Sequence, residues 1–341
     1  MDSLIFYYPE GHQKHYLPGH PERPERVEVI RRGLQEAGYW DRFPVIEPAL
    51  PSQDLLGEVH EVEFLRLLEL ASQREQMLDP DTYAMRDSWQ LALNAAGGAV
   101  AVVDQVWEGL ASTGFALTRP PGHHATRSRA MGFCLINNVA VAAQYLVQEK
   151  GAAKIAIVDL DLHHGNGTQD IFWNRGDVVY ISIHQAPFYP GTGALYEIGV
   201  GPGEGATLNL PIPAFSGDAA YKTLLTEIIL PYLDQAGAEC LLISFGFDTH
   251  WRDPLGSMQV SADCVYWMIG ALRNWAARNC QGKIVVILEG GYDLEAGKAC
   301  GQAVGAGLLN DPWEDDLGRS PRSESDSWRE TLREAKGMLD N

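Results

Sequence analysis

The middle of the chain alternates short apolar runs with helical segments, and this alternation restricts the fold more than any other feature. The apolar runs are continuous and rich in β-branched residues, which is typical of strands buried on both faces. They occupy residues 115–118, 154–161, 178–184, 240–248 and 283–291. Segments with a helical pattern follow them at residues 138–148, 167–173, 219–233, 262–277 and 294–308. We therefore predict a single-domain α/β fold, with a mostly parallel central sheet and helices on both faces.

The two ends of the chain differ from this middle part. Residues 20–38 and 87–111 have helical patterns joined by irregular loops, and we expect them to pack beside the sheet within the same domain. After Pro312 the sequence becomes polar and charged. We expect one domain over residues 1–312 and a polar extension over residues 313–341, which packs on that domain or trails from it.

The charge balance of 26 basic and 45 acidic residues gives a net charge of −19. Such a field repels nucleic acid and attracts cationic ligands, although the same charge also serves solubility alone. No apolar run approaches the roughly 18 residues of a membrane span, and the first residues lack the pattern of a signal peptide. We therefore expect a cytoplasmic protein without nucleic-acid or membrane partners. Its five scattered cysteines indicate reduced thiols, with no disulfide framework and no CxxC metal site.

Polar residues gather where the apolar runs end, which is where ligands bind in open parallel sheets. Asp159, Asp161 and His163 lie two residues apart, so strand geometry would place them on one face. Asp248 ends the run at 240–248. A strand-end Asp often only caps the next helix, but several buried polar groups need compensation. A metal ion at Asp161, His163 and Asp248 would provide it, and three ligands leave positions open for catalysis.

Two further motifs carry unusual polar residues. RPPGHHA (119–125) places His123 and His124 side by side after a rigid turn, and EGGY (289–292) places Tyr292 after two glycines that free the backbone. Taken alone, the histidine pair would be interpreted as loop hydrogen bonding.

The motifs taken together resemble those of the histone deacetylase superfamily in order and in spacing, from roughly residue 10 to residue 310. They are RPPGHHA (119–125), GFCLINNVA (132–140), DLDLHHGNGTQ (159–169), PGTG (190–193), GFDTHWRDPLG (246–256) and EGGY (289–292). The HHGNG form and DPDT (79–82) are most similar to class II deacetylases and their bacterial relatives. Those relatives include deacetylase-like amidohydrolases and acetylpolyamine amidohydrolases. The resemblance implies an arginase/deacetylase-like fold and a metal-dependent deacetylase, a hydrolase of linear amide C–N bonds.

The resemblance also implies which cofactors bind. Zn²⁺ would be held by Asp161, His163 and Asp248, and Fe²⁺ also suits this hard ligand set. Such an ion polarises the acyl carbonyl and lowers the pKa of a bound water toward roughly 7. A structural K⁺ would be held partly by Asp159 and Ser182.

By the same resemblance, the catalytic roles fall on five residues. His123, paired with Asp159, would be the cationic charge stabiliser. His124, paired with the uncharged Asn166, would be the less basic imidazole and the general base and acid. Tyr292 would donate to the oxyanion, and relatives with His at this position are nearly inactive on acetyl-lysine. The division of roles between the two imidazoles stays open, because paired rings can titrate as one unit.

The substrate-binding residues implied by the resemblance are Gly132, Phe133, Tyr189, Leu255, Asp81 and His20. Phe133 and Tyr189 would wall an acyl-lysine tunnel, although either aromatic alone would be interpreted as a core residue. The family more often has Phe where this chain has Tyr189. Leu255 would lie near the tunnel mouth, and Asp81 (or Asp79) would bind the substrate backbone unless it caps a helix. His20 would order loops or lie near the entrance.

We thus predict zinc-dependent removal of acetyl or other acyl groups from lysine side chains or related N-acyl amines. The partner would be an acetyl-lysine protein or peptide, or an acetylated polyamine if the chain is an acetylpolyamine amidohydrolase. A dinuclear manganese ureohydrolase would need further Asp ligands beside Asp248, where the chain has Thr249 and His250. A non-catalytic acyl-lysine-binding protein is opposed by the complete ligand set and by Tyr292. The oligomeric state stays open.

Overall fold

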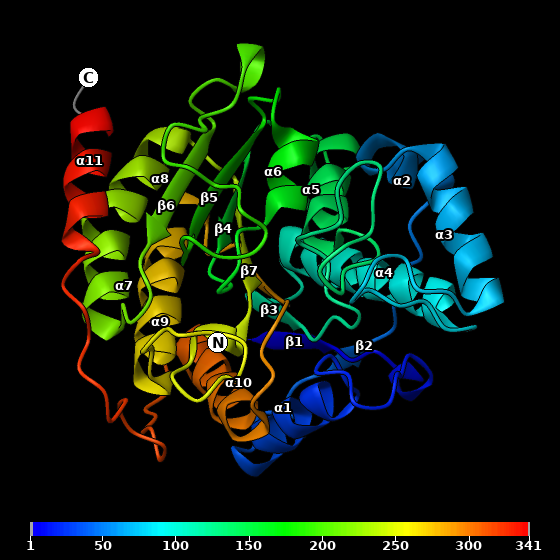
Figure 1. The fold of residues 1–341 in the computed structure, drawn as a ribbon, viewed down its shortest axis with the longest axis horizontal. Coiled ribbons are helices and arrows are strands. Elements are labelled where there is room, and N and C mark those ends of the chain that lie inside the picture. The colour runs from blue at the N-terminus through cyan, green and yellow to red at the C-terminus, as the bar shows by residue number, and fades with distance from the viewer. Residues whose placement is uncertain (1–2, 340–341) are drawn as a thin grey trace.

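Eight parallel strands form one sheet at the centre of the computed structural model, which describes residues 3–339 (Figure 1). Their order across the sheet is β2-β1-β3-β8-β7-β4-β5-β6. The strands are β1 (Leu4–Tyr7), β2 (Val45–Ile46), β3 (Thr113–Ala116), β4 (Ile155–Asp159), β5 (Val178–Gln185), β6 (Thr207–Ile212), β7 (Cys240–Phe245) and β8 (Ile284–Leu288). The predicted fold class is confirmed: every strand pair is parallel.

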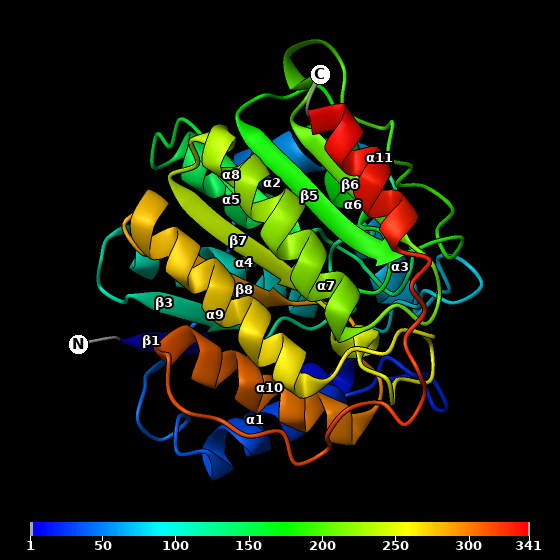
Figure 2. The same cartoon turned by 90° about the vertical axis from the view of Figure 1, so that its left-hand side faces the viewer.

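Helices cover both faces of the sheet, so the molecule has three layers. One face carries α1 (Glu25–Glu36), α7 (Asp218–Leu224), α8 (Leu230–Ala236), α9 (Ala262–Asn279), α10 (Leu294–Leu309) and α11 (Arg329–Leu339), which lie in front in Figure 2. The other face carries α2 (Gln53–Val59), α3 (Val62–Arg74), α4 (Ser88–Trp107), α5 (Asn138–Gln148) and α6 (Asn166–Phe172). One π-helical turn, Leu225–Ile229, joins α7 to α8.

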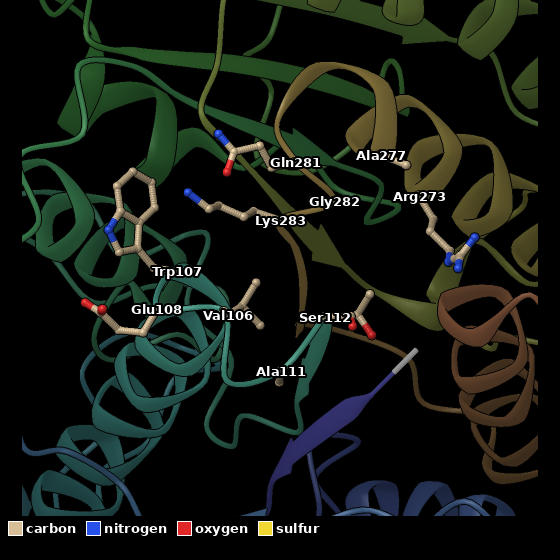
Figure 3. Close-up of a pocket in the computed structure, with 12 residues that line it drawn as sticks. Val106, Trp107, Glu108, Ala111, Ser112, Arg273, Ala277, Gln281, Gly282 and Lys283 are labelled. Atoms are coloured by element: carbon tan, nitrogen blue, oxygen red, sulfur yellow. The ribbon is translucent and has the colours of Figure 1, made fainter. Parts of the chain in front are cut away.

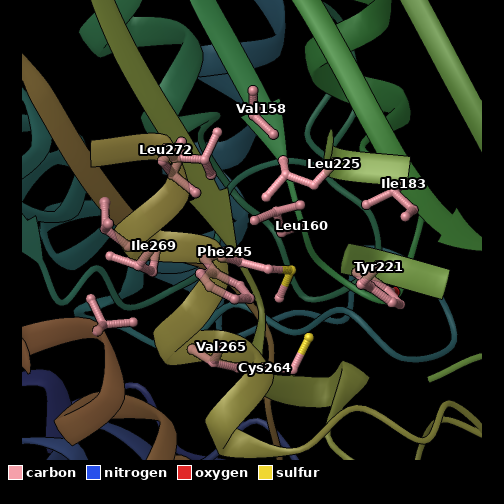
Figure 4. Packing of buried hydrophobic residues seen from close by; sticks show 14 of the residues in the cluster. Val158, Leu160, Ile183, Tyr221, Leu225, Phe245, Cys264, Val265, Ile269 and Leu272 are labelled. Atoms are coloured by element: carbon pink, nitrogen blue, oxygen red, sulfur yellow. The ribbon is translucent and has the colours of Figure 1, made fainter. Parts of the chain in front are cut away.

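Successive residues of the central strands enter two separate hydrophobic cores. In β4, Val158 packs toward the helices α7 to α10 and Ile157 packs toward the opposite layer. Figure 4 shows Val158 and Phe245 beside Ile269 and Leu272 of α9. Because both faces are buried, the strands read as continuous apolar runs, and each fully buried aliphatic side chain contributes about 1.5–3 kcal/mol.

Three strands were missed by the sequence analysis. The N-terminal third, expected to be helical, also supplies β1, whose four residues are all buried, and the two-residue β2. Both are too short to show a periodicity. The edge strand β6 contains Asn209 and Pro211, which argue against a strand in sequence. Proline is tolerated there because an edge strand leaves one row of N–H groups unpaired.

The polar C-terminal segment ends in α11, which lies beside β6 and the π-helical turn Leu225–Ile229 (Figure 2). Trp328 and Leu332 are buried in the core cluster on that face, and the Thr331 hydroxyl donates to the Pro211 carbonyl oxygen at 2.6 Å. Hydrophobic contacts thus attach this part of the chain to the sheet's edge. Within residues 3–339, no helix has the length and apolar character needed to cross a membrane.

Candidate active site

The loops that follow four neighbouring strands meet at one edge of the sheet. Asp161 and His163 follow β4, Asp248 follows β7, Tyr292 follows β8, and His124 lies in the loop after β3. These strands are adjacent in the order β3-β8-β7-β4. Since all carboxyl ends of parallel strands lie at the same edge, residues distant in sequence converge there.

The three predicted metal ligands form one cluster. Donor atoms of Asp161, His163 and Asp248 all lie within 4.8 Å of one another, and both carboxylates are fully buried. Nδ1 of His163 lies 3.1 Å from Oδ1 of Asp161 and 3.2 Å from Oδ2 of Asp248. Although that nitrogen is close, no hydrogen bond within residues 3–339 reaches Oδ2 of Asp248. A buried carboxylate oxygen without a donor, beside oxygen and nitrogen ligands, fits a divalent cation.

Two glycines make room for these carboxylates. A Cβ at Gly246 would lie 1.8 Å from Oδ2 of Asp161, and one at Gly290 would lie 2.3 Å from Oδ2 of Asp248. The Gly290 N–H donates to Asp161 at 3.0 Å. Any larger residue would displace the ligands, which explains Gly246 and the first glycine of the EGGY motif.

The two adjacent histidines have different partners. Nδ1 of His123 lies 3.1 Å from Oδ2 of Asp159, and Nδ1 of His124 lies 2.8 Å from Oδ1 of Asn166. The two ring centroids are 4.0 Å apart, and both rings are buried. The structure therefore brings together both pairs that the sequence analysis predicted.

Their surroundings separate the two imidazoles electrostatically. Burial alone would lower the pKa of His123, but the carboxylates of Asp161 and Asp159 outweigh it and raise that pKa above its ordinary value. Burial lowers the pKa of His124, and the neighbouring His123 and His163 lower it further. At neutral pH this environment favours a cationic His123 and a neutral His124.

A cavity of about 260 Å³ opens onto these residues. Its lining comprises Asp81, Pro121, His123, His124, Gly132, Phe133, Cys134, His163, Phe188, Tyr189, Leu255, Gly290 and Tyr292. The Phe133 ring stands perpendicular to that of Tyr292, with centroids 5.8 Å apart, and Tyr189 meets His124 edge-on at 5.2 Å. Phe188, which was not predicted as a site residue, stacks on the candidate ligand His163 at 5.5 Å.

From the sequence, either Asp81 or Asp79 could bind the substrate backbone, and the structure shows that the two aspartates differ in position. Asp81 lines the cavity, whereas Asp79 accepts the N–H groups of Asp81 and Thr82 at 3.0 and 2.6 Å and so shapes the turn. Neither caps a helix, since the next helix begins at Ser88. His20 donates from Nε2 to the Asp81 carbonyl oxygen at 3.0 Å and packs edge-on against Phe133 at 4.6 Å. His20 thus supports the rim without lining the cavity.

A buried ion network behind Tyr292 was also missed. Glu22 accepts from Arg26 at 3.0 Å and from Arg119 at 2.7 Å, and all three side chains are buried. Arg26 also donates to the Gly291 carbonyl oxygen at 2.6 Å, and its guanidinium lies 4.8 Å from the Tyr292 ring centroid. The sequence HPERPERV did not indicate this network, because the first turn of a solvent-exposed helix often carries the same charged residues.

Glu289, the first residue of the EGGY motif, accepts hydrogen bonds from the backbone of the turn that carries the two histidines. Its Oε2 accepts the N–H groups of Gly122 and His123 at 2.7 and 3.1 Å, and its Oε1 accepts from the Ser244 hydroxyl at 2.6 Å. This carboxylate fixes the backbone of Gly122 and His123 to the segment directly after strand β8. No role was predicted for it.

The residues predicted to hold potassium are neighbours across the sheet. Asp159 and Ser182 are register partners on β4 and β5. The Ser182 hydroxyl lies 2.9 Å from Nδ1 of His184, and Asp159 also accepts the Tyr180 hydroxyl at 3.1 Å.

A larger hollow of about 490 Å³ lies elsewhere, where β3 and β8 begin (Figure 3). Its lining includes Trp107, Ser112, Arg273 and Lys283, and Lys283 Nζ lies 4.0 Å from the Trp107 ring centroid. None of the predicted catalytic residues lines it. Volume therefore does not identify the functional site here, whereas the convergence of polar side chains does.

The fold and the site together define an α/β protein with a candidate divalent-metal set at the carboxyl edge of a parallel sheet. The family model described as the histone deacetylase domain matches residues 20–308, and the chain belongs to the histone deacetylase family. A probable deacetylase of Archaeoglobus fulgidus is 39% identical over 86% of this chain and 82% of its own length. The histone deacetylase-like amidohydrolase of Pseudomonas aeruginosa is 36% identical over 89% of this chain and 83% of its own. The crystal structure of the HDA15 HD domain superimposes with a TM-score of 0.90 at 36% identity, covering 99% of this chain and 95% of that one.

Proposed function

We propose that this protein is a metal-dependent amidohydrolase that removes acetyl or other acyl groups from lysine side chains or related N-acyl amines. One observation carries the proposal: His163 of the candidate ligand set, both histidines and Tyr292 line the same aromatic-walled cavity. The relatives named deacetylase and deacetylase-like amidohydrolase support the same reaction class.

Asp161, His163 and Asp248 would hold the cation, for which Zn²⁺ and Fe²⁺ both suit the ligand set. When bound, such an ion supplies a Lewis acid for the acyl carbonyl and lowers the pKa of water. The chain itself must then move protons and stabilise charge, because an amide's amine leaves only when it is protonated.

Each remaining group has a role suited to its surroundings. His124, kept neutral and oriented by Asn166, takes the proton of the attacking water and passes it to the leaving amine. His123, kept cationic by Asp161 and Asp159, stabilises the negative charge that develops beside it. The Tyr292 hydroxyl donates to the oxyanion, and burial keeps it protonated by raising its pKa.

The cavity suits a slender acyl-amine chain. Phe133, Tyr189 and Leu255 provide a mostly apolar passage for methylene groups, and Asp81 at its rim is placed to accept an N–H of a peptide backbone. The same carboxylate and the net charge of −19 also favour a cationic polyamine, which is therefore the second candidate substrate. A K⁺ beside Asp159 and Ser182 would serve structure, and their adjacent register supports that part of the proposal.

Two experiments test this function. The first compares kcat/KM for an acetyl-lysine peptide, acetylputrescine and longer acyl-lysines with the metal-loaded protein; absence of hydrolysis for every acyl amine would favour a binding protein instead. The second is Tyr292→Phe, which we expect to retain metal but to lose about 100-fold or more in kcat. A near-wild-type rate would refute the role of Tyr292.

A further inference from the structure

Asp253 is a buried carboxylate at the site that the proposed chemistry does not use. It is 6% exposed and follows the metal ligand Asp248 in the same loop. Its Oδ2 accepts the N–H groups of Tyr292 at 2.6 Å and Asp293 at 3.2 Å, and its Oδ1 accepts the Leu255 N–H at 2.9 Å. Burying a carboxylate is unfavourable unless it is hydrogen-bonded, so these three bonds determine where it can lie.

The peptide plane between Gly291 and Tyr292 is held at both of its polar atoms. Its N–H donates to Asp253, and its carbonyl oxygen accepts from Nε of Arg26 at 2.6 Å. Gly291 has a φ of 110°, a conformation that side chains rarely adopt, and it follows another glycine. Two glycines leave the direction of the next side chain undetermined by the backbone itself. The hydrogen bonds from Asp253 and Arg26 therefore determine the direction in which Tyr292 leaves the strand.

The same carboxylate joins two walls of the cavity. Through Oδ1 it holds the Leu255 segment at the mouth, and through Oδ2 it holds the segment of the proposed oxyanion donor, Tyr292. Both residues line the cavity. One side chain thus fixes the position of the loop that would contact substrate relative to the segment that carries the catalytic hydroxyl.

We propose that Asp253 is a positioning residue that holds the Tyr292 peptide, and with it the phenol, in the geometry that oxyanion donation requires. This inference rests on the proposed role of Tyr292. Misplacing a catalytic group by about 1 Å costs about 100-fold in rate, so the clamp is expected to act on kcat.

The first measurement is amide hydrogen exchange of the segment that contains Tyr292 and Asp293, which needs no turnover. Asp253→Ala is expected to speed exchange at these two amides about tenfold or more, because both lose their acceptor. Asp253→Asn retains one oxygen and is expected to have a smaller effect. Unchanged exchange at both amides in both variants would overturn the clamp.

The second measurement separates positioning from general damage. Asp253→Ala is expected to lower kcat about 20-fold or more, and Asp253→Asn about threefold to tenfold, in the wild-type background. In the Tyr292→Phe background neither change should lower kcat further, although the effect on KM through Leu255 should persist. An equal loss of kcat in both backgrounds would refute positioning through Tyr292.

Asp218 provides a matched control. It is also 6% exposed and also joins two segments, by accepting the backbone N–H of Ser261 at 2.8 Å and its hydroxyl at 2.7 Å. Asp218→Asn should lower the melting temperature while leaving kcat and the exchange at Tyr292 unchanged. If Asp253→Ala does not fold, Asp253→Asn tests the proposal by itself. An unchanged kcat in that variant contradicts positioning of Tyr292 by Asp253. A fully active Tyr292→Phe would refute the proposed function, whereas the exchange result tests the clamp independently.

Discussion

Nδ1 of His124 lies 2.8 Å from the side-chain oxygen of Asn166. An amide oxygen orients the imidazole without adding charge, so burial and the neighbouring rings keep the pKa of His124 below its ordinary value. His123, 4.0 Å away between ring centroids, faces a carboxylate instead. This difference in partners divides the roles that we assign to the two rings.

Asn166→Asp should shift the acid limb of the pH profile of kcat/KM to higher pH by about one unit or more. A carboxylate at this position stabilises the imidazolium, so the pKa of His124 rises and a higher pH is needed to free the base. Asn174→Asp introduces the same charge at an exposed position after α6 and should leave the profile unchanged. Identical acid limbs for wild type and Asn166→Asp would argue against His124 as the base.

Removing the divalent ion should destabilise the wild-type protein. Asp161 and Asp248 are buried side by side, and a bound cation would relieve the repulsion between them. Saturating Zn²⁺ at about 100 times Kd should add about 2.7 kcal/mol to the free energy of unfolding. Thermal melts with and without a chelator, together with metal analysis, measure this effect. In Asp248→Asn, the bound metal and the chelator effect should both disappear; retained metal would contradict the ligand assignment.

Leu255→Glu should move substrate preference toward acetylated polyamines. A carboxylate at the half-buried mouth attracts a polyamine's distal ammonium, and 1.4 kcal/mol of added attraction corresponds to about tenfold in relative kcat/KM. The control Leu255→Gln introduces a side chain of nearly the same shape as Glu but without charge. It should not change the ratio of kcat/KM for acetylputrescine to kcat/KM for the acetyl-lysine peptide. Equal ratios for the two variants would show that charge at the mouth does not set specificity.

Glu22→Gln should lower the free energy of unfolding at pH 7 by about 3 kcal/mol, because it leaves two buried arginines without a carboxylate. Burial alone would raise the pKa of Glu22, but Arg119 and Arg26 outweigh it and lower that pKa from 4.5 to about 2. A lowered folded-state pKa stabilises above pH 4.5, and this contribution is lost as the pH falls toward 2.

Denaturant unfolding between pH 7 and pH 3 measures both parts of this prediction. The wild type should lose stability below pH 4.5 more steeply than Glu22→Gln. The groups facing Glu22 include Tyr83, whose hydroxyl lies 3.3 Å away, and His15, at 3.6 Å. Burial lowers the pKa of His15 to about 3, whereas Glu22 opposes this shift. His15 therefore adds acid sensitivity to both proteins, and the two differ in this respect only as the pH approaches 3. The exposed Glu25→Gln should change stability by less than about 1 kcal/mol.

Much of the fold could be read from local pattern. The β4, β5, β7 and β8 regions were predicted because strands buried on both faces must be apolar throughout. The same logic placed Asp161, Asp248 and Tyr292 near one another, since parallel strands end at one edge. The short β1 and the proline-containing β6 escaped because their place in the sheet comes from pairing with neighbours rather than from periodicity.

By itself, the sequence determined the layered α/β architecture, the family and the motif residues of the candidate site, because strand length, turn residues and motif order are local properties. Only the tertiary structure decided which charges are buried and what they hold. Glu22 meets Arg119 across 97 positions, and Arg26 meets Gly291 across 265. A charged residue has the same letter whether water or a buried partner surrounds it. Desolvation and pairing across the fold therefore distinguish Glu22 and Asp253 from the exposed acidic residues that share their composition.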